Sequence, residues 1–264
     1  MAIFQDQIGN SIELNTRPKR IISLVPSITE FLSDINLDKE VVGITKFCVH
    51  PKTWLKEKAV VGGTKQQHID QIKDLKPDLI IANKEENTKD YVDQLADICP
   101  IYVSEVNDFD SSIEMMLSIG KITDKEDESN RLVEYIKKEF HSLSIPNQQT
   151  KVAYCIWKNP WMWAGSANYI SNMLELCGFK NVIDIQRYPE ISMDDIINKK
   201  PELVFLSSEP YPFKEEHISE LKKEYPNTNF KIVDGEMFSW YGSRMLKLPN
   251  YAQLLLSEIE SETI

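Results

Sequence analysis

The chain has 264 residues, of which 42% are hydrophobic and 27% are charged, and its formal net charge is −11. This composition is typical of a globular protein that buries a sizeable core. The acidic balance argues against a nucleic-acid-binding protein, because that class needs surfaces rich in Lys and Arg to neutralise phosphates. Apolar runs stay well short of the roughly 20 residues of a transmembrane helix, so we expect a protein that does not span a membrane.

The N-terminal residues and the cysteines narrow the class further. The first six residues contain neither a basic stretch nor an apolar one, which predicts no signal peptide. The cysteines at positions 48, 99, 155 and 177 are scattered without a C-x-x-C motif. Their spacing favours neither a zinc site nor a disulfide framework, and packing is the expected role of most of them.

The first half of the chain alternates short strands with helices. Gly9-Asn10 between two alternating runs predicts a hairpin. Buried-type apolar runs predict strands over 20–25, 41–44, 79–82 and 101–104. Helices are expected after 26–30 and over 91–98, and tight loops at 46–51 and 62–65.

The middle of the chain, 109–146, is predicted to be helical. Ser111 with Glu114, and Thr123 with Glu126, match the S/T-x-x-E capping box of a helix start. After the second box, apolar residues recur at helical period until Pro146 ends the pattern. A helix over 124–143 would be roughly 30 Å long. We therefore expect one long helix to bridge the two halves of the chain.

The sequence on the two sides of this segment repeats at a fixed offset. Residues 69–81 align with residues 193–205, and each copy contains a short amphipathic helix, a Lys-Pro pair and an apolar strand. The same offset carries Glu85 onto Glu209. The repeat predicts two α/β lobes joined by the bridging helix, with bounds of 1–108, 109–146 and 147–264.

The second half repeats the alternation of the first. Strands are predicted over 151–157, 203–206 and 231–233, and a helix over 169–177 that Gly178 closes. The loops 158–165, 207–212 and 234–244 follow predicted strands and are rich in Trp, Tyr and Phe. Ligands bind beyond the carboxyl ends of strands in open α/β sheets. These loops are therefore the predicted site, although the aromatic residues could instead cap the two lobes.

Catalytic signatures are missing from the sequence. It contains no G-x-S-x-G, H-E-x-x-H or G-x-G-x-x-G motif and no P-loop, which predicts a protein without enzymatic activity or an intrinsic cofactor. The four histidines show no metal-ligand spacing. His50 and His68 lie near strand ends, and Glu85 and Glu209 are hard oxygen donors, but solvated side chains are the alternative at each position.

These segments resemble the helical-backbone substrate-binding proteins of ABC importers, which handle cobalamin, haem and iron siderophores. The resemblance is carried by residues 20–30, 75–81 and 200–204, and it covers nearly the whole chain. Within the family, the chain is most similar to the cobalamin-binding branch. The segments that carry this similarity are residues 47–51, 62–65, 83–87, 208–211 and 240–244. The resemblance implies two Rossmann-like lobes with a ligand cleft between them, and a monomer that is periplasmic or on the cell surface.

The resemblance also implies which residues bind the ligand. In the cobalamin binders, aromatic residues of both lobes enclose the corrin ring, but the matching positions here are mostly not aromatic. Neighbouring aromatic and charged residues are expected to take that role. The predicted ligand-binding residues are Phe47, Cys48, His50, Lys65, Glu85, Trp161, Trp163, Tyr188, Glu209, Phe238, Trp240, Tyr241 and Arg244.

Two functional hypotheses result. The first is a non-catalytic binding protein that delivers cobalamin or another metal chelate to an ABC permease. In the family, acids at the positions of Asp70 and Asp194 contact the permease, so these two residues are the predicted docking points. The second hypothesis is a cytoplasmic metal or corrinoid chaperone, or an enzyme, that acts through His50, Glu85 and Glu209.

Overall fold

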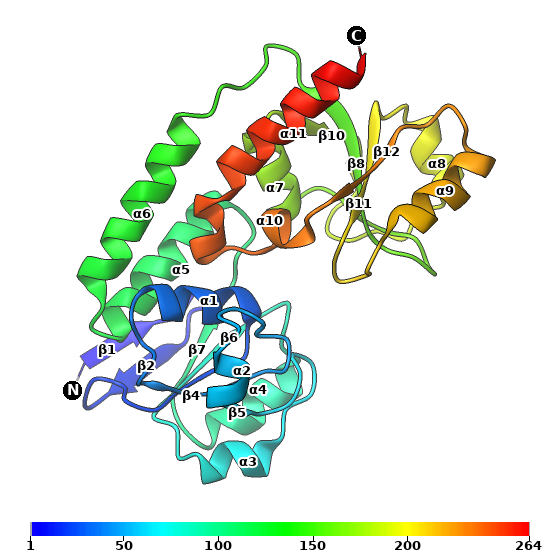
Figure 1. Cartoon of the computed structure of the whole chain (residues 1–264). Helices are drawn as coiled ribbons and strands as arrows, with labels where there is room; N and C mark the ends of the chain where they lie inside the picture. The colour runs from blue at the N-terminus through cyan, green and yellow to red at the C-terminus, as the bar shows by residue number, and fades with distance from the viewer. Residues whose placement is uncertain (1, 264) are drawn as a thin grey trace. The chain divides into compact units, whose positions relative to one another are not determined.

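The chain forms two compact α/β units in the computed structural model, which describes residues 2–263, without the side chains of residues 260, 262 and 263. Unit 1 comprises the chain up to Val106, Asp110–Lys137 and Tyr241–Arg244; unit 2 comprises Asn107–Phe109, Lys138–Trp240 and the chain from Met245 onward. Each unit contains a parallel sheet (Figure 1). The predicted class, two α/β lobes, is confirmed, whereas the predicted bounds of 1–108, 109–146 and 147–264 stay a prediction.

Unit 1 contains a fully parallel sheet in the order β5-β4-β3-β6-β7. A separate antiparallel hairpin, β1 and β2, turns at Gly9, whose φ of 91° is accessible to glycine at little cost. The strands are β1 (Ala2–Gln5), β2 (Ser11–Leu14), β3 (Ile21–Ser23), β4 (Val41–Ile44), β5 (Ala59–Val60), β6 (Leu79–Asn83) and β7 (Ile101–Ser104). The first helices are α1 (Pro26–Asp34), α2 (Trp54–Glu57), α3 (Ile69–Asp74) and α4 (Lys89–Ala96).

Apolar side chains from α3 and α4 pack against one face of this sheet. Ile72 of α3 and Leu95 of α4 are fully buried with Ile22 of β3 and Ile80 of β6. The alternation of side chains along each strand sends the neighbouring residues, such as Ile81, to the opposite face. Both faces are covered, which explains why these strands read as continuous apolar runs.

Unit 2 has a parallel sheet in the order β10-β8-β11-β12, and β9 pairs antiparallel with β8. The strands are β8 (Thr150–Trp157), β9 (Met162–Ala164), β10 (Phe179–Asn181), β11 (Leu203–Ser207) and β12 (Phe230–Val233). The helical elements of the second half are α7 (Tyr169–Leu176), α8 (Met193–Asn198), α9 (Glu215–Glu224), α10 (Gly235–Ser239), the 3₁₀ helix η1 (Gly242–Leu246) and α11 (Leu248–Thr263).

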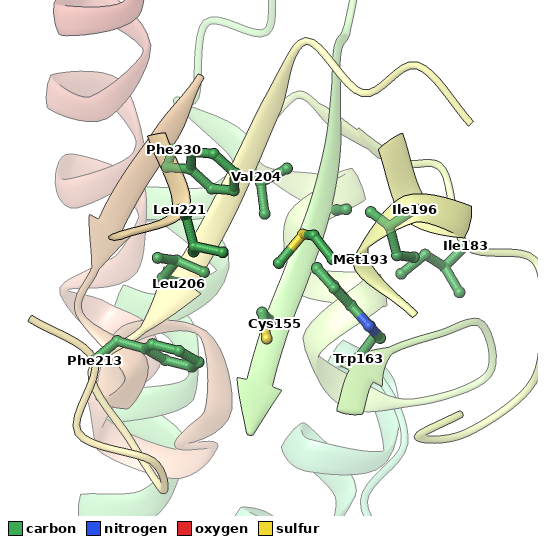
Figure 2. Packing of buried hydrophobic residues seen from close by; sticks show 11 residues of the cluster. Cys155, Trp163, Ile183, Met193, Ile196, Val204, Leu206, Phe213, Leu221 and Phe230 are labelled. Atoms are coloured by element: carbon green, nitrogen blue, oxygen red, sulfur yellow. The ribbon is translucent and has the colours of Figure 1, made fainter. Parts of the chain in front are cut away.

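The core of unit 2 has a different character on each face of its sheet. On one face, Met193 and Ile196 of α8 and Leu221 of α9 join strand residues such as Val204 (Figure 2). The other face is aromatic: Phe205 of β11 contacts Tyr154, Phe179 and Phe238 at centroid distances of 5.3–6.4 Å. The contacts with Tyr154 and Phe179 are edge to face and the contact with Phe238 is stacked, and aromatic pairs of both kinds add to the free energy gained from burial alone.

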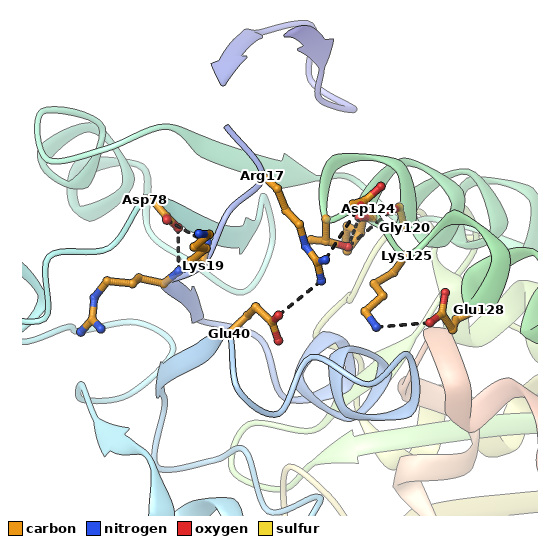
Figure 3. A network of polar contacts seen from close by, with 11 residues as sticks. Arg17, Lys19, Glu40, Asp78, Gly120, Asp124, Lys125 and Glu128 are labelled. Carbon is orange, nitrogen blue, oxygen red and sulfur yellow. Dashed lines mark hydrogen bonds and ion pairs between the residues drawn. The ribbon is translucent and has the colours of Figure 1, made fainter. Parts of the chain in front are cut away.

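The structure confirms the internal repeat. Helices α3 and α8, and strands β6 and β11, begin and end at positions separated by the predicted offset. Between helix and strand, Lys76 and Lys200 both adopt a positive φ, 48° and 56°. The acids after each Lys-Pro have the same role, since Asp78 accepts hydrogen bonds from the amides of Lys19 and Arg20, and Glu202 accepts one from the amide of Lys151. Figure 3 shows the contacts of Asp78.

The middle segment differs from the prediction, because it is two helices rather than one. Helix α5 (Phe109–Ile122) ends before Asp124, whose φ is 56°, and α6 (Glu126–His141) follows. Thr123 does not cap α6: its hydroxyl donates to the carbonyl oxygen of Ile119 at 2.7 Å, at the end of α5. Ser111 lies inside α5 and does not start it. Both predicted capping boxes are therefore wrong.

Polar contacts stabilise the turn between α5 and α6. The Ser129 hydroxyl donates to the carbonyl of Met116 at 2.8 Å, and Lys125 pairs with Glu128 at 3.2 Å. Arg17 forms ion pairs with Asp124 at 3.5 Å and Glu40 at 3.3 Å (Figure 3). Separately, the helices within residues 2–263 include none with the length and hydropathy needed to cross a membrane.

Candidate functional site

In unit 1, the loop after β6 is fixed by two asparagines. The Asn83 side-chain oxygen accepts hydrogen bonds from the amides of Glu85 and Glu86, at 2.8 and 3.1 Å. Asn87 donates to the carbonyls of Leu24 and Thr64, at 3.3 and 2.8 Å. These bonds join the loops that follow β3, β5 and β6, so the carboxyl edge of the sheet is a pre-organised surface.

Four of the predicted ligand-binding residues are exposed or half-buried on this edge. Phe47 follows β4 and is 50% exposed, and the Lys46 ammonium lies 5.1 Å from its ring centroid. Lys65 is exposed and donates to the carbonyl oxygen of Glu85, whose side chain is half-buried. His50 is also half-buried in the loop after β4. This edge combines an aromatic face with charges of both signs.

Cys48 is a correction to the predicted site. Its side chain is fully buried, and its sulfur lies 3.1 Å from the Thr29 hydroxyl and 3.2 Å from the Thr45 hydroxyl. Burial raises the pKa of the thiol above its usual value. An inaccessible, protonated thiol cannot contact a ligand, so Cys48 is a packing residue.

Arg244 and Tyr241 are also buried, at 5% exposure each. The Arg244 guanidinium donates from Nε to Oε2 of Glu30 at 2.9 Å. The Tyr241 hydroxyl donates to Oε1 of Glu86 at 3.3 Å, and burial raises the pKa of Tyr241. The predicted ligand contact of Arg244 is therefore replaced by an ion pair within unit 1, and Tyr241 supports the loop after β6.

In unit 2, the carboxylate of Glu209 contacts the segment that follows β12. Its Oε1 accepts hydrogen bonds from the Ser239 hydroxyl at 3.0 Å and from the Trp240 indole at 2.7 Å. Trp240 is 7% exposed. Burial raises the pKa of Glu209, and the charges of Glu236 and Asp234 raise it further, whereas its two donors lower it. Glu209 thus holds Trp240 in place.

Trp163 and Phe238 are further corrections, because both are fully buried. The Trp163 indole donates to the carbonyl of Ile191 at 2.9 Å, and Phe238 belongs to the aromatic face of the sheet. Trp161 and Tyr188 are half-buried in the loops after β8 and β10, which leaves both accessible. Residue type alone could not separate core aromatics from accessible ones.

A polar cavity in unit 2 was not predicted. It has a volume of about 480 Å³ and is lined by residues that include Asn107, Asn168, Asn172 and Arg187. The Arg187 guanidinium donates to the side-chain oxygen of Asn107 at 2.8 Å. None of the predicted ligand-binding residues lines this cavity. A single sequence offered no signal for it, because its lining comes from distant segments.

Two roles remain: metal binding, which only the alternative hypothesis requires, and docking to a permease. Among the side chains that the structure describes, no group of three or more His, Cys, Asp or Glu residues could hold a metal ion. Asp70 and Asp194 are exposed in the first turns of α3 and α8. Asp194 accepts a hydrogen bond from the Tyr225 hydroxyl at 2.9 Å; the docking role of both acids stays a prediction.

Comparisons with known proteins agree with this architecture. The family model described as periplasmic binding protein matches residues 21–229. A vitamin B12-binding protein of Yersinia pestis (strain Pestoides F) is 24% identical over 195 residues, which are 72% of this chain and 69% of that protein.

Solved structures show the same fold. The periplasmic vitamin B12 binding protein BtuF of Vibrio cholerae has a TM-score of 0.69 and 21% identity, with 90% of this chain and 98% of that chain covered. The periplasmic heme-binding protein RhuT from Roseiflexus sp. RS-1 has a TM-score of 0.77 and 16% identity, with 90% and 97% covered. The predictions of a non-catalytic substrate-binding protein and of the fold are confirmed. The chain belongs to the periplasmic binding protein family.

Proposed function

We propose that the protein binds a corrinoid or another metal chelate and delivers it to an ABC importer. The observation that carries the proposal is that accessible aromatic and charged side chains lie in loops at the strand ends of both units. They are Phe47, Lys65 and Glu85 in unit 1, and Trp161 and Tyr188 in unit 2. Large aromatic side chains with a few charged groups suit a bulky, partly apolar ligand. The names of the relatives, vitamin B12-binding and heme-binding proteins, support this ligand class.

Native mass spectrometry of the protein as isolated, followed by calorimetric titration with cyanocobalamin, hemin and a ferric siderophore, tests the ligand class. We expect one equivalent of one of these chelates to bind. Stoichiometric metal without an organic ligand would favour the metal-chaperone hypothesis instead. A protein that binds none of the three chelates would contradict the proposal.

Delivery to a permease implies that the protein works outside the cytoplasmic membrane. Family members are periplasmic binding proteins, and this supports the same location here. Fractionation of the native cells tests it, with the protein expected outside the cytoplasm. Recovery in the cytosol would favour a cytoplasmic carrier.

Asp70 and Asp194 are the proposed docking points for the permease. Both are exposed and occupy equivalent positions of the repeat, each in the first turn of its helix. Negative charge there also compensates the helix dipole, so the test must separate the two roles. The double substitution D70K/D194K should abolish transport and leave ligand affinity unchanged, because rim charges act mainly on association. D74K, at an exposed position of α3, is the control; unaltered transport in the double variant would remove the docking role.

A further inference from the structure

Trp240 and Tyr241 are consecutive residues, and each donates a hydrogen bond to a carboxylate. The Trp240 indole donates to Oε1 of Glu209 at 2.7 Å, and the Tyr241 hydroxyl donates to Oε1 of Glu86 at 3.3 Å. The two aromatic residues are only 7% and 5% exposed. Because both rings are buried, these residues hold the two acids in place and are not themselves ligand contacts.

The two acids lie in equivalent loops of the internal repeat. Glu86 lies in the loop after β6, in unit 1, next to Glu85. Glu209, the counterpart of Glu85 in the repeat, lies in the loop after β11, in unit 2. The chain passes from unit 2 to unit 1 at the peptide bond between Trp240 and Tyr241. Consecutive residues thus bond to corresponding loops, Trp240 in unit 2 and Tyr241 in unit 1.

Hydrogen bonds fix the backbone on both sides of this pair of residues. The Trp240 amide donates to the carbonyl of Glu236 at 3.1 Å, and its carbonyl accepts from the Tyr169 hydroxyl at 3.4 Å, both within unit 2. On the other side, the Gly242 amide donates to the Ser112 hydroxyl at 3.4 Å, within unit 1. Trp240 is extended, with φ −94° and ψ 111°, and extended backbone directs successive side chains to opposite sides. The two rings therefore point to different partners and move together with one backbone segment.

Both acids belong to loops that are held firmly. The Glu86 amide donates to the Asn83 side-chain oxygen at 3.1 Å, a contact that fixes the loop after β6. The Glu209 carbonyl accepts from the Ser207 hydroxyl, and its side chain packs so closely on Gly235 that a Cβ there would lie 2.5 Å from the Glu209 Cγ. Since closely packed groups transmit a displacement to their neighbours, a shift of either carboxylate moves the loop that carries it.

We infer that Trp240 and Tyr241 are positioning residues that couple two loops, residues 83–87 of unit 1 and residues 207–211 of unit 2. Order in one loop stabilises the other, although neither aromatic residue touches the ligand. The inference rests on the proposed function, in which loops at the strand ends of both units bind the ligand. It extends that function, because a ligand that orders one loop then also lowers the mobility of the other.

Hydrogen exchange of the full chain without ligand, measured by mass spectrometry, tests the coupling. W240F removes the indole N–H in unit 2 and should speed exchange of the unit 1 peptide over 83–87 at least about three-fold, because the segment that positions Tyr241 loses one of its anchors. Y241F removes the hydroxyl in unit 1. It should speed exchange of the unit 2 peptide over 207–211, since coupling free energies are reciprocal. Y241F also provides the measurement if W240F does not fold.

Two further variants serve as controls. S239A is the matched control, because the Ser239 hydroxyl also donates to Oε1 of Glu209, at 3.0 Å, but is anchored within α10 on the carbonyl of Gly235. S239A should change exchange only within unit 2. E209Q keeps a side-chain oxygen that can accept from the Trp240 indole, so exchange over 83–87 should stay at the wild-type rate.

Exchange that rises only in the unit that carries the substitution would overturn the inference and leave the proposed function intact. A rise that the buried strand β4, residues 41–44, shares with the loops would show general loosening and would overturn it as well. Failure of the wild type to bind cyanocobalamin, hemin or a ferric siderophore would contradict the proposed function, while the exchange of the free protein would still decide the coupling.

Discussion

Replacing Arg244 by Met tests whether this residue is structural. The Nε of Arg244 lies 2.9 Å from Oε2 of Glu30, and the two side chains are only 6% and 11% exposed. Removing Arg244 takes the ion-pair partner away from the buried Glu30 carboxylate, and breaking a buried pair in this way costs about 3–5 kcal/mol. For a chain of this length, a loss of about 3 kcal/mol lowers the melting temperature by roughly 6–12 °C.

The assay is urea unfolding followed by far-UV circular dichroism, with ligand titration on the same samples. R17M is the control in the same unit, because Arg17 and Glu40 form a more exposed pair, with side chains 38% and 21% accessible. Such a pair contributes at most about 1 kcal/mol. The double variant E30Q/R244M removes both charges. Its loss of unfolding free energy should therefore be smaller, by at least about 1 kcal/mol, than the sum of the losses of E30Q and R244M.

A single result would refute the structural interpretation of Arg244. R244M that unfolds like the wild type but no longer binds the ligand would make Arg244 a ligand contact, as the resemblance implied. R244M that is unstable but binds with normal affinity below its unfolding midpoint would confirm a structural role for the Arg244 guanidinium.

Three further predictions concern pH, thiols and packing. Burial raises the pKa of Glu209 in the folded state, so the stability that its protonated form contributes is fully present below the unfolded pKa and is lost as the pH rises through the folded pKa. The free energy of unfolding of E209Q, measured in urea, should therefore rise relative to that of the wild type between pH 4 and 7. Plots of this free energy against pH that run parallel for the two proteins would contradict the prediction. All four cysteines are buried and their thiol pKa values are raised, to about 12 for Cys99 and Cys177, so a thiol reagent at pH 8 should label none of them in the native protein and all four in urea. G165A should be strongly destabilising, because its Cβ would lie 1.9 Å from the carbonyl oxygen of Ile185; near-normal stability would show that this loop can shift.

Much of the fold could be predicted because the repeat contains strong local signals. A fully apolar run after Lys-Pro has few alternatives to a buried parallel strand, and β6 and β11 begin where the pattern predicted, at Leu79 and Leu203. The break at Asp124 was harder to predict. Thr123 with Glu126 matches a capping box, but a Thr hydroxyl can also bond to a carbonyl one turn back, as it does to Ile119. The sequence pattern does not distinguish these two roles.

The candidate site was predicted less well, because accessibility depends on distant contacts. Two of the segments predicted as aromatic loops of unit 2 contain regular structure, because Trp163 lies in the short antiparallel strand β9 and 235–239 forms helix α10. The sequence did not show that Trp163 faces the core. Nor did it show that Arg244 pairs with Glu30, at the other end of the chain. Such contacts depend on the tertiary arrangement, which a single sequence does not reveal.

The two copies of the repeat show how far fold and function can separate within one chain. Lys76 and Lys200 share a positive φ, and Asp78 and Glu202 both accept hydrogen bonds from backbone amides, so the two copies have the same groups where these shape the backbone. Glu85 and Glu209 occupy equivalent positions, yet the backbone carbonyl of Glu85 accepts from Lys65, whereas the carboxylate of Glu209 accepts from Trp240. Equivalent loops thus carry different chemistry at the same offset. A ligand residue inferred from the fold alone therefore needs its own test, even when its counterpart lies in the same molecule.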